Sequence, residues 1–178
     1  MDLDLLGLYR RTSDWTRSHI VAAAAQLDAP TPCDEWTTRQ LLNHMLETQR
    51  YFAASARGED ASPPGPVPPS LLSDDPVRDF DTARDDVLTA FADPEVVEKT
   101  GPALGIAFGD LLLHGWDLAR ATGRDAAMPP GTAEAAYQLI HGRFTDEQRK
   151  GVFKPEVEIG DDASPQDRLL AYVGRDPR

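Results

Sequence analysis

The stretch Phe108–Gly123, FGDLLLHGWDLARATG, constrains the fold of this chain more than any other segment. Its leucines and Trp116 have the spacing expected of a helix with a buried face. Among these apolar residues it also carries two acids and an imidazole, Asp110, His114 and Asp117. Burying such groups is costly unless a hydrogen-bond partner or a metal ion compensates them. The segment therefore predicts a core helix with a polar site built into it.

Two long helices are predicted in the N-terminal part of the chain. The segment 3–27 is rich in leucine and alanine, and residues 8–27 contain no Gly or Pro, which favours a continuous helix. A second helix is expected to begin after Thr37, because Thr37 and Gln40 match a T-x-x-Q capping box. It should end near Arg57, immediately before a glycine.

A proline-rich connection separates these helices from two more. Five prolines lie within residues 63–69, a composition that favours a stiff, exposed crossover over a regular element. Asp75 as the N-cap and Pro76 at the first helical position begin a third helix, which should end near Asp93. The fourth helix is the apolar one described above, expected over about 103–122.

The pattern as a whole predicts an all-α protein: a four-helix bundle with a Pro-rich crossover and a short C-terminal helical extension. A shorter helix is expected over 132–142, and a last one after Ser164, which has the sequence of an N-cap. We expect one domain over residues 1–178, with a core of about 1–142 and an extension of about 143–178.

The composition favours a globular protein of the cytoplasm. Of the residues, 40% are hydrophobic and 27% are charged, which argues against global disorder. A net charge of -12, with only three lysines, makes nucleic acid and anionic membranes poor partners. No apolar run approaches the roughly 18 residues of a membrane span, and the first residues are acidic where a signal peptide is basic. A single cysteine agrees with a reducing compartment.

Asp110 and His114 have the spacing of metal ligands on the fourth helix. Residues four apart project from one face of a helix, and carboxylate and imidazole are normal ligands of Zn²⁺ and similar ions. His44, on the second helix among apolar neighbours, would be a third ligand and leave positions open for water or substrate. The residues alone leave an alternative open, in which the acid and the imidazole form an ordinary buried hydrogen-bonded pair.

The motifs PCDEWTTRQLLNHM and LLLHGWDLARATG, followed by a C-terminal GRDP, resemble the DinB-like metal-binding bundles. The similarity covers most of the chain and is to the branch related to the metal-binding domain of mycothiol-dependent maleylpyruvate isomerase. It implies a four-helix bundle that holds a divalent metal, zinc or nickel, with one residue of the second helix and two of the last core helix. Those roles fall on His44, Asp110 and His114.

The resemblance also implies an activity. An enzyme of this class would bind a small thiol, mycothiol, as thiolate at an open metal position and pass it to an electrophilic substrate. Two departures bear on this: many relatives have His or Glu at the position of Asp110, and the isomerase has a substantial second domain where only residues 143–178 follow here. A non-catalytic metal- or ligand-binding module, and a bundle with a decayed metal site, are alternatives. The resemblance is also compatible with a homodimer.

Two accessory acids have alternative interpretations, and no catalytic residue is assigned. Glu47, on the second helix, can act as a water-mediated ligand or general base, or form a solvated pair with Arg50. Asp117 can orient the imidazole of His114 or bind Arg120.

Four further residues receive structural interpretations. Trp36 is predicted to be a core or staple residue rather than a substrate platform. Cys33 precedes a helix whose dipole would stabilise a thiolate, but no base is adjacent in sequence, so it is interpreted as a small packing residue of the loop. His19 and His141 have no partner at ligand spacing and are interpreted as surface or structural histidines.

Overall fold

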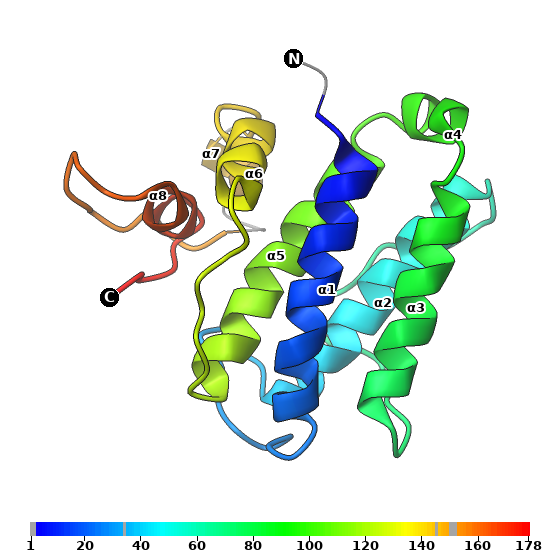
Figure 1. Cartoon of the computed structure of the whole chain (residues 1–178), viewed down its shortest axis with the longest axis horizontal. Coiled ribbons are helices and arrows are strands. Elements are labelled where there is room, and N and C mark those ends of the chain that lie inside the picture. Colours follow the sequence, from blue (N-terminus) through cyan, green and yellow to red (C-terminus); the bar gives the residue numbers. More distant parts are fainter. Residues whose placement is uncertain (1–2, 34, 145, 150–152) are drawn as a thin grey trace. The chain divides into compact units, whose positions relative to one another are not determined.

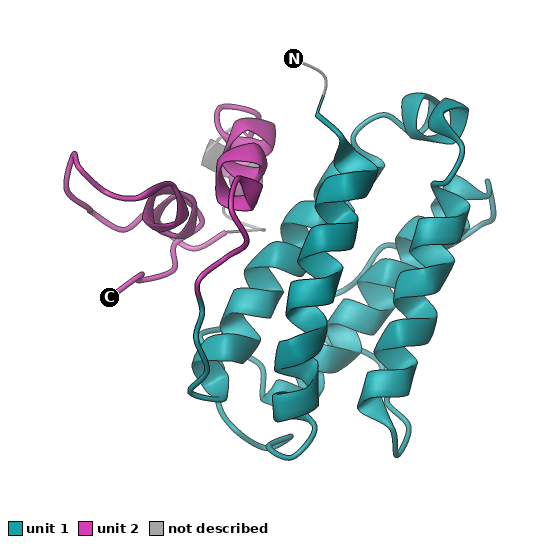
Figure 2. Ribbon diagram, in the orientation of Figure 1, with its two compact units in different colours: residues 1–126 teal, residues 127–178 magenta. Residues whose placement is uncertain are grey.

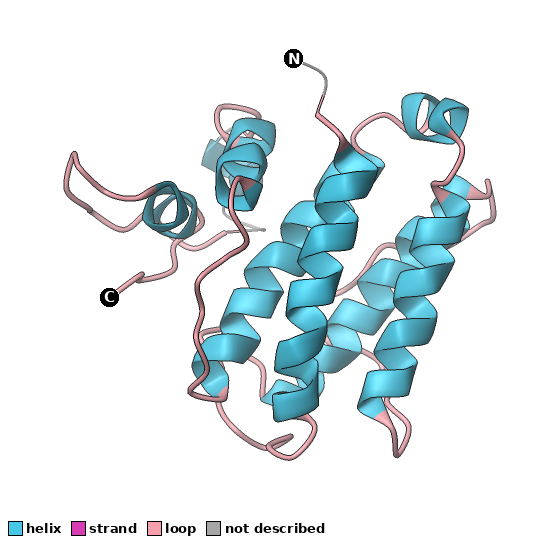
Figure 3. Cartoon of the chain, in the orientation of Figure 1, coloured by secondary structure: helices cyan, strands magenta, loops and turns pink. Residues whose placement is uncertain are grey.

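The structure, a computed structural model, describes residues 3–33, 35–144, 146–149 and 153–178. Within these residues it contains helices and no strand, which confirms the all-α prediction (Figure 3). The chain divides into two compact units, residues 1–126 and 127–178 (Figure 2). This division lies earlier than residue 142, where the sequence placed the end of the core. That both units form one domain stays a prediction.

The first unit is a four-helix bundle (Figure 1). α1 (Leu5–Ala23) and α2 (Thr38–Ala56) each pack against both α3 (Pro76–Ala90) and α5 (Ala103–Ala121), so the four helices close a ring. This is the bundle that the sequence predicted, with the Pro-rich crossover between its second and third helices.

The ends of these helices follow the local signals of the sequence. The backbone N–H of Gln40 donates to the hydroxyl of Thr37, and the N–H of Thr37 donates to the side chain of Gln40 at 2.9 Å, which completes the predicted capping box. Asp75 caps α3 with Pro76 at its first turn. Gly123, at φ 65°, follows α5 in the left-handed conformation that glycine adopts most readily.

A helix begins at the residues where the third helix was predicted to end. The predicted third helix stops at Ala90, and a short helix α4 (Pro94–Lys99) follows it. The side chain of Asp93 accepts a hydrogen bond from the N–H of Glu95 at 2.9 Å, and Pro94 occupies the first helical position. Asp-Pro is therefore the start signal of a new helix here, as it is for α3.

α5 is enclosed by its neighbours along most of its length, with every residue from Leu111 to Ala119 buried. A Cβ at Gly115 would lie 2.5 Å from the hydroxyl of Thr16 and 2.6 Å from the ring of Trp15. The missing side chain thus lets α1 approach α5 closely. Since α2 packs against α5 as well, polar residues of α5 must find their partners within the bundle.

Hydrogen bonds attach the Pro-rich crossover to the start of α2. The side-chain oxygen of Asn43 accepts from the backbone N–H groups of Leu71 and Leu72, at 2.6 and 2.9 Å. The indole N–H of Trp36 donates to the carbonyl of Pro66 at 3.2 Å. The crossover therefore runs beside the end of α2 that carries His44.

The second unit is a small helical body with an aromatic centre. The ring of Tyr172 lies 5.6 Å from that of Tyr137, and the guanidinium of Arg149 lies 4.2 Å from the centre of the Tyr172 ring. Ser164 caps its last helix, as predicted, by accepting from the N–H of Asp167. No helix in the described part of either unit has the length and hydrophobicity that a membrane span requires. The helices of this unit are α6 (Thr132–Ile140), α7 (Asp146–Arg149) and α8 (Pro165–Tyr172).

Candidate metal centre

The three predicted ligands meet inside the bundle. One carboxylate oxygen of Asp110, Oδ1, lies 3.4 Å from Nε2 of His44 and 3.5 Å from Nε2 of His114. His44 comes from α2, and the other two residues lie one turn apart on α5. The candidate ligand atoms of all three residues lie within 4.8 Å of one another. Two imidazoles and one carboxylate therefore converge on one point.

These separations fit a divalent cation. They are long for charge-assisted hydrogen bonds, which measure about 2.7–2.9 Å. Two ligands at about 2.0–2.2 Å from a tetrahedral zinc ion lie about 3.4 Å apart, which is the spacing of His44 and His114 from Asp110. Nitrogen and oxygen ligands of this kind also suit nickel. The group is compatible with a divalent metal ion.

Asp117 holds the imidazole of His114 in place. Its Oδ2 lies 2.9 Å from Nδ1 of His114, and the side chain of Asp117 is fully buried. If Nδ1 carries the proton and donates to Asp117, the lone pair of Nε2 faces Asp110. The predicted contact of Asp117 with His114 is therefore present in the structure.

Asp110 and His114 shift each other's pKa values. Burial by itself would raise the pKa of Asp110, but the charge of His114 and hydrogen bonds from His114 and His44 lower it below its usual range. Burial would lower the pKa of His114, but the charge of Asp110 and hydrogen bonds to Asp110 and Asp117 raise it to about 9. Without a metal, His114 therefore holds a proton that a cation would replace, because a ligating imidazole must be neutral.

Trp36 lies over the cluster and is more than a staple residue. Its ring centroid is 4.5 Å from that of His44 and 6.0 Å from that of His114, with the rings tilted by 33° and 52°. Trp36 itself is half-buried. The indole therefore separates part of the cluster from solvent. The sequence places Trp36 before the cap of α2 but does not indicate that it contacts both imidazoles.

Cys33 is also part of this region, which the sequence interpretation missed. Its Sγ and the ligand atoms of His114 and Asp117 lie within 4.8 Å of one another. The interpretation as a loop-packing residue relied on the lack of a base next to Cys33 in sequence. The loop before α2 instead brings the thiol to α5, so the base is a neighbour only in space.

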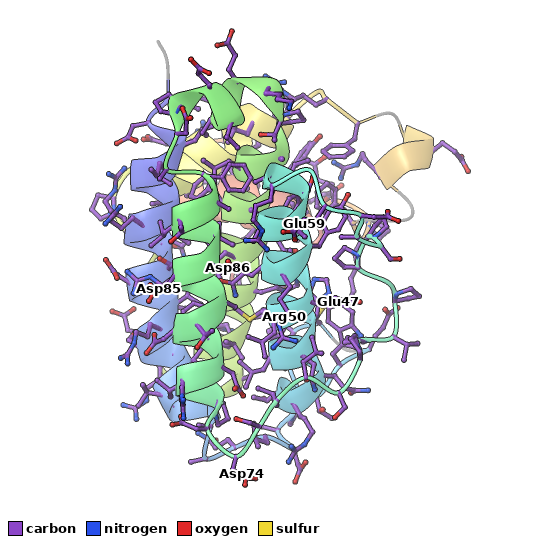
Figure 4. All side chains as sticks on the ribbon, turned by 90° about the vertical axis from the view of Figure 1, so that its right-hand side faces the viewer. Glu47, Arg50, Glu59, Asp74, Asp85 and Asp86 are labelled. Carbon is purple, nitrogen blue, oxygen red and sulfur yellow. The ribbon has the colours of Figure 1, made fainter. Side chains whose placement is uncertain are left out.

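Glu47 lies one turn after His44 on α2. Its Oε2 is buried and has no hydrogen-bond partner among the described residues. Within that part of the chain Glu47 forms no ion pair with Arg50. Arg50 instead lines a groove with Asp85 and Asp86 of α3 (Figure 4). The general-base and water-mediated roles of Glu47 stay predictions.

The other two histidines lie elsewhere. His19 is buried on α1 against the ring of Trp15, with the ring centroids 4.7 Å apart. His141 is exposed and stacks on Tyr137 in the second unit. Neither joins a group of metal-ligand atoms in the residues that the structure describes.

Comparison with known proteins identifies the family of this chain. The sequence model of the mycothiol maleylpyruvate isomerase N-terminal domain matches residues 10–119, which include His44, Asp110, His114 and Asp117. Two uncharacterized proteins of Mycobacterium tuberculosis, one from strain H37Rv and one from strain CDC 1551, are each 30% identical over 185 residues, spanning 99% of this chain and 100% of theirs. No solved structure matches the chain significantly. These matches confirm the resemblance seen in the motifs, and the chain belongs to the mycothiol maleylpyruvate isomerase N-terminal domain family.

Proposed function

We propose that this protein is a cytoplasmic, divalent-metal-dependent enzyme that transfers a small thiol, mycothiol or a close analogue, to an electrophilic substrate. The observation that carries the proposal is the convergence of His44, Asp110 and His114 within 4.8 Å. Membership of a family defined by a mycothiol-dependent isomerase domain supports the thiol as cosubstrate.

In this proposal the two Nε2 atoms of His44 and His114 and the carboxylate of Asp110 hold zinc or nickel. When bound, the cation lowers the pKa of a coordinated thiol, which supplies a thiolate nucleophile at neutral pH. Asp117 keeps the imidazole of His114 in the orientation that ligation needs. Trp36 limits the access of water from its side of the cluster.

Glu47 is the proposed proton acceptor. It lies on the same face of α2 as His44, because residues three apart are neighbours on a helix. A buried carboxylate oxygen without a partner can take the proton that leaves the thiol sulfur, before the sulfur forms its bond to the electrophile. Glu47→Gln should then slow thiol transfer while it leaves the metal content unchanged.

Elemental analysis of untagged protein tests the metal site first. Near-stoichiometric zinc or nickel is expected in the wild type and in His141→Ala, a control that removes a histidine outside the cluster. The metal should be lost in His114→Ala and in His44→Ala, and weakened less in Asp110→Asn. Equal loss from His141→Ala, or no metal in the wild type after addition of divalent ions and dialysis, would contradict the ligand assignment.

A conjugation assay then tests the chemistry. Metal-loaded protein should accelerate the reaction of mycothiol with at least one member of a panel of electrophiles, and His44→Ala should abolish that acceleration. If the wild type retains its metal but accelerates no member of the panel, and no thiol perturbs the metal, the protein is a non-catalytic metal-binding module instead.

A further inference from the structure

A second group of ligand-type atoms adjoins the first. Sγ of Cys33, a nitrogen of His114 and a carboxylate oxygen of Asp117 all lie within 4.8 Å of one another. Cys33 comes from the loop before α2, and the other two residues come from α5. His114 and Asp117 are buried and Cys33 is half-buried, so the group is largely enclosed by protein.

The two carboxylates lie at different nitrogens of the same ring. Nε2 of His114 faces Asp110, at 3.5 Å, whereas Nδ1 faces Asp117, at 2.9 Å. We propose that Cys33, His114 and Asp117 form a second cation position, distinct from the one at His44, that takes a soft metal ion. The proposal concerns metal binding and does not require the enzymatic activity proposed above.

The charge of the region favours a cation. Two carboxylates, Asp110 and Asp117, flank the single imidazole of His114, and the side chain of Asp117 is fully buried. A bound cation beside these two carboxylates offsets the cost of burying their charge.

The thiol determines which cation suits this position. Thiolate is a soft ligand that favours soft ions such as Cu⁺, and Cd²⁺ is a soft probe of the same type. Binding forms a metal–sulfur bond and releases the thiol proton of Cys33 to solvent. The group at His44 has only nitrogen and oxygen ligands, so it lacks this preference for soft ions.

The two positions should exclude each other. A neutral imidazole has one nitrogen lone pair and carries a proton on the other nitrogen. If Nδ1 of His114 ligates a soft ion, its proton moves to Nε2, which then no longer binds a cation beside His44. A soft ion would therefore withdraw His114 from the first group, and one cation should bind per chain.

Cadmium binding tests the proposal, because the chain contains one cysteine and any cadmium–thiolate absorption reports on Cys33. Dilute, metal-free protein in a thiol-free buffer is titrated with Cd²⁺ and followed by ultraviolet difference absorption and equilibrium dialysis. We expect the thiolate band at one cadmium per chain in the wild type and, with similar affinity, in His44→Ala. Cys33→Ser should lose the band and bind cadmium at least about 10- to 100-fold more weakly, the range seen when even an outer-shell partner is lost.

Two further variants test whether cadmium binds the thiol of Cys33 without His114 and Asp117. The band should weaken strongly in His114→Ala and in Asp117→Asn, which has the same size as the natural side chain. An unchanged band in both variants would overturn the proposal, as would the absence of a band in the wild type. Loss of the band in His44→Ala would also overturn it, because Cys33 would then complete the first group. The cadmium outcomes do not depend on whether a variant still transfers thiol. The soft-metal proposal and the proposed enzymatic function can therefore each fail without the other.

Discussion

His114 on α5 and His19 on α1 are buried almost equally, with 7% and 5% of their surface exposed, yet their surroundings act on them in opposite ways. His114 lies between two carboxylates, and its pKa is raised to about 9. His19 packs against Trp15, its Nε2 has no hydrogen-bond partner among the described residues, and burial lowers its pKa. Burial of a histidine is therefore not by itself a sign of a site.

The difference lies in what converges on each ring. Four polar side chains from two helices and a loop surround His114, and two of them are carboxylates. At His19 the dominant effect is desolvation, which favours the neutral ring. A charged, convergent cluster can hold a cation, whereas an isolated neutral imidazole behaves as part of the core.

The largest difference between the two histidines should appear in metal affinity. His114→Ala removes a ligand and is expected to weaken zinc binding by more than ~100-fold, beyond the range for an outer-shell partner. His19→Ala should leave it unchanged, although it opens a cavity of similar size. Competition with a fluorescent chelator measures both. A similar loss in the two variants would mean that general destabilisation, not ligation, removes the metal.

The stability of the metal-free protein should fall on the alkaline side because of His114. Its pKa is raised to about 9 in the folded protein, so its contribution is complete below the unfolded pKa of about 6.5 and is lost as pH rises through 9. The loss is on the order of 3 kcal/mol at most. Urea denaturation in a chelator from pH 6 to 10 should show this decline in the wild type and in His19→Gln, and its absence in His114→Ala.

Asp117→Asn should have an intermediate effect. The asparagine keeps the size of the side chain but holds Nδ1 of His114 less firmly, and loss of such a partner typically costs about 10- to 100-fold in metal affinity. Isothermal titration with zinc, beside Asp81→Asn as a control on α3, measures this. An affinity equal to that of the wild type would show that Asp117 does not orient the ligand.

The smallest effect is expected from His19 on the acid side. Because burial lowers its pKa, the unfolded chain takes up this proton at a higher pH than the folded one, so stability falls as pH drops below about 6.5. The contribution of His114 to the pH dependence is the same in the wild type and in His19→Gln, so it cancels in the difference between them. As the pH falls from 6.5 to 5, urea denaturation should therefore show the wild type losing stability relative to His19→Gln. Equal slopes would mean that His19 takes up its proton as readily folded as unfolded.

The helices could be predicted because their signals are local. Capping at Thr37 and Asp75 and the glycine after α5 depend on residues three or four apart, and all three act as predicted. The short helix α4 has the same kind of signal, but Asp93 and Pro94 were assigned to the end of α3. The boundary between the two compact units does not follow from such local signals, because it depends on which helices pack together.

Only part of the site could be predicted in the same way. The pairing of Asp110 with His114 follows from helical spacing, and His44 was proposed as the third ligand from its place among apolar residues of the second helix, a role that the resemblance also implies. Trp36 and Cys33 were missed as members of the site. Their contacts with His44, His114 and Asp117 depend on the path of the loop between α1 and α2, which helical periodicity does not describe.

The sequence by itself determined the helices, their caps and the face of α5 that carries Asp110 and His114. These features depend on backbone hydrogen bonds and side chains within about one helical turn. Only the tertiary structure decided that one oxygen of Asp110 faces two imidazoles, and that a cysteine lies beside His114. Such contacts join residues far apart in the chain, and they form only when the packing of α1, α2 and α5 excludes water and fixes their relative positions.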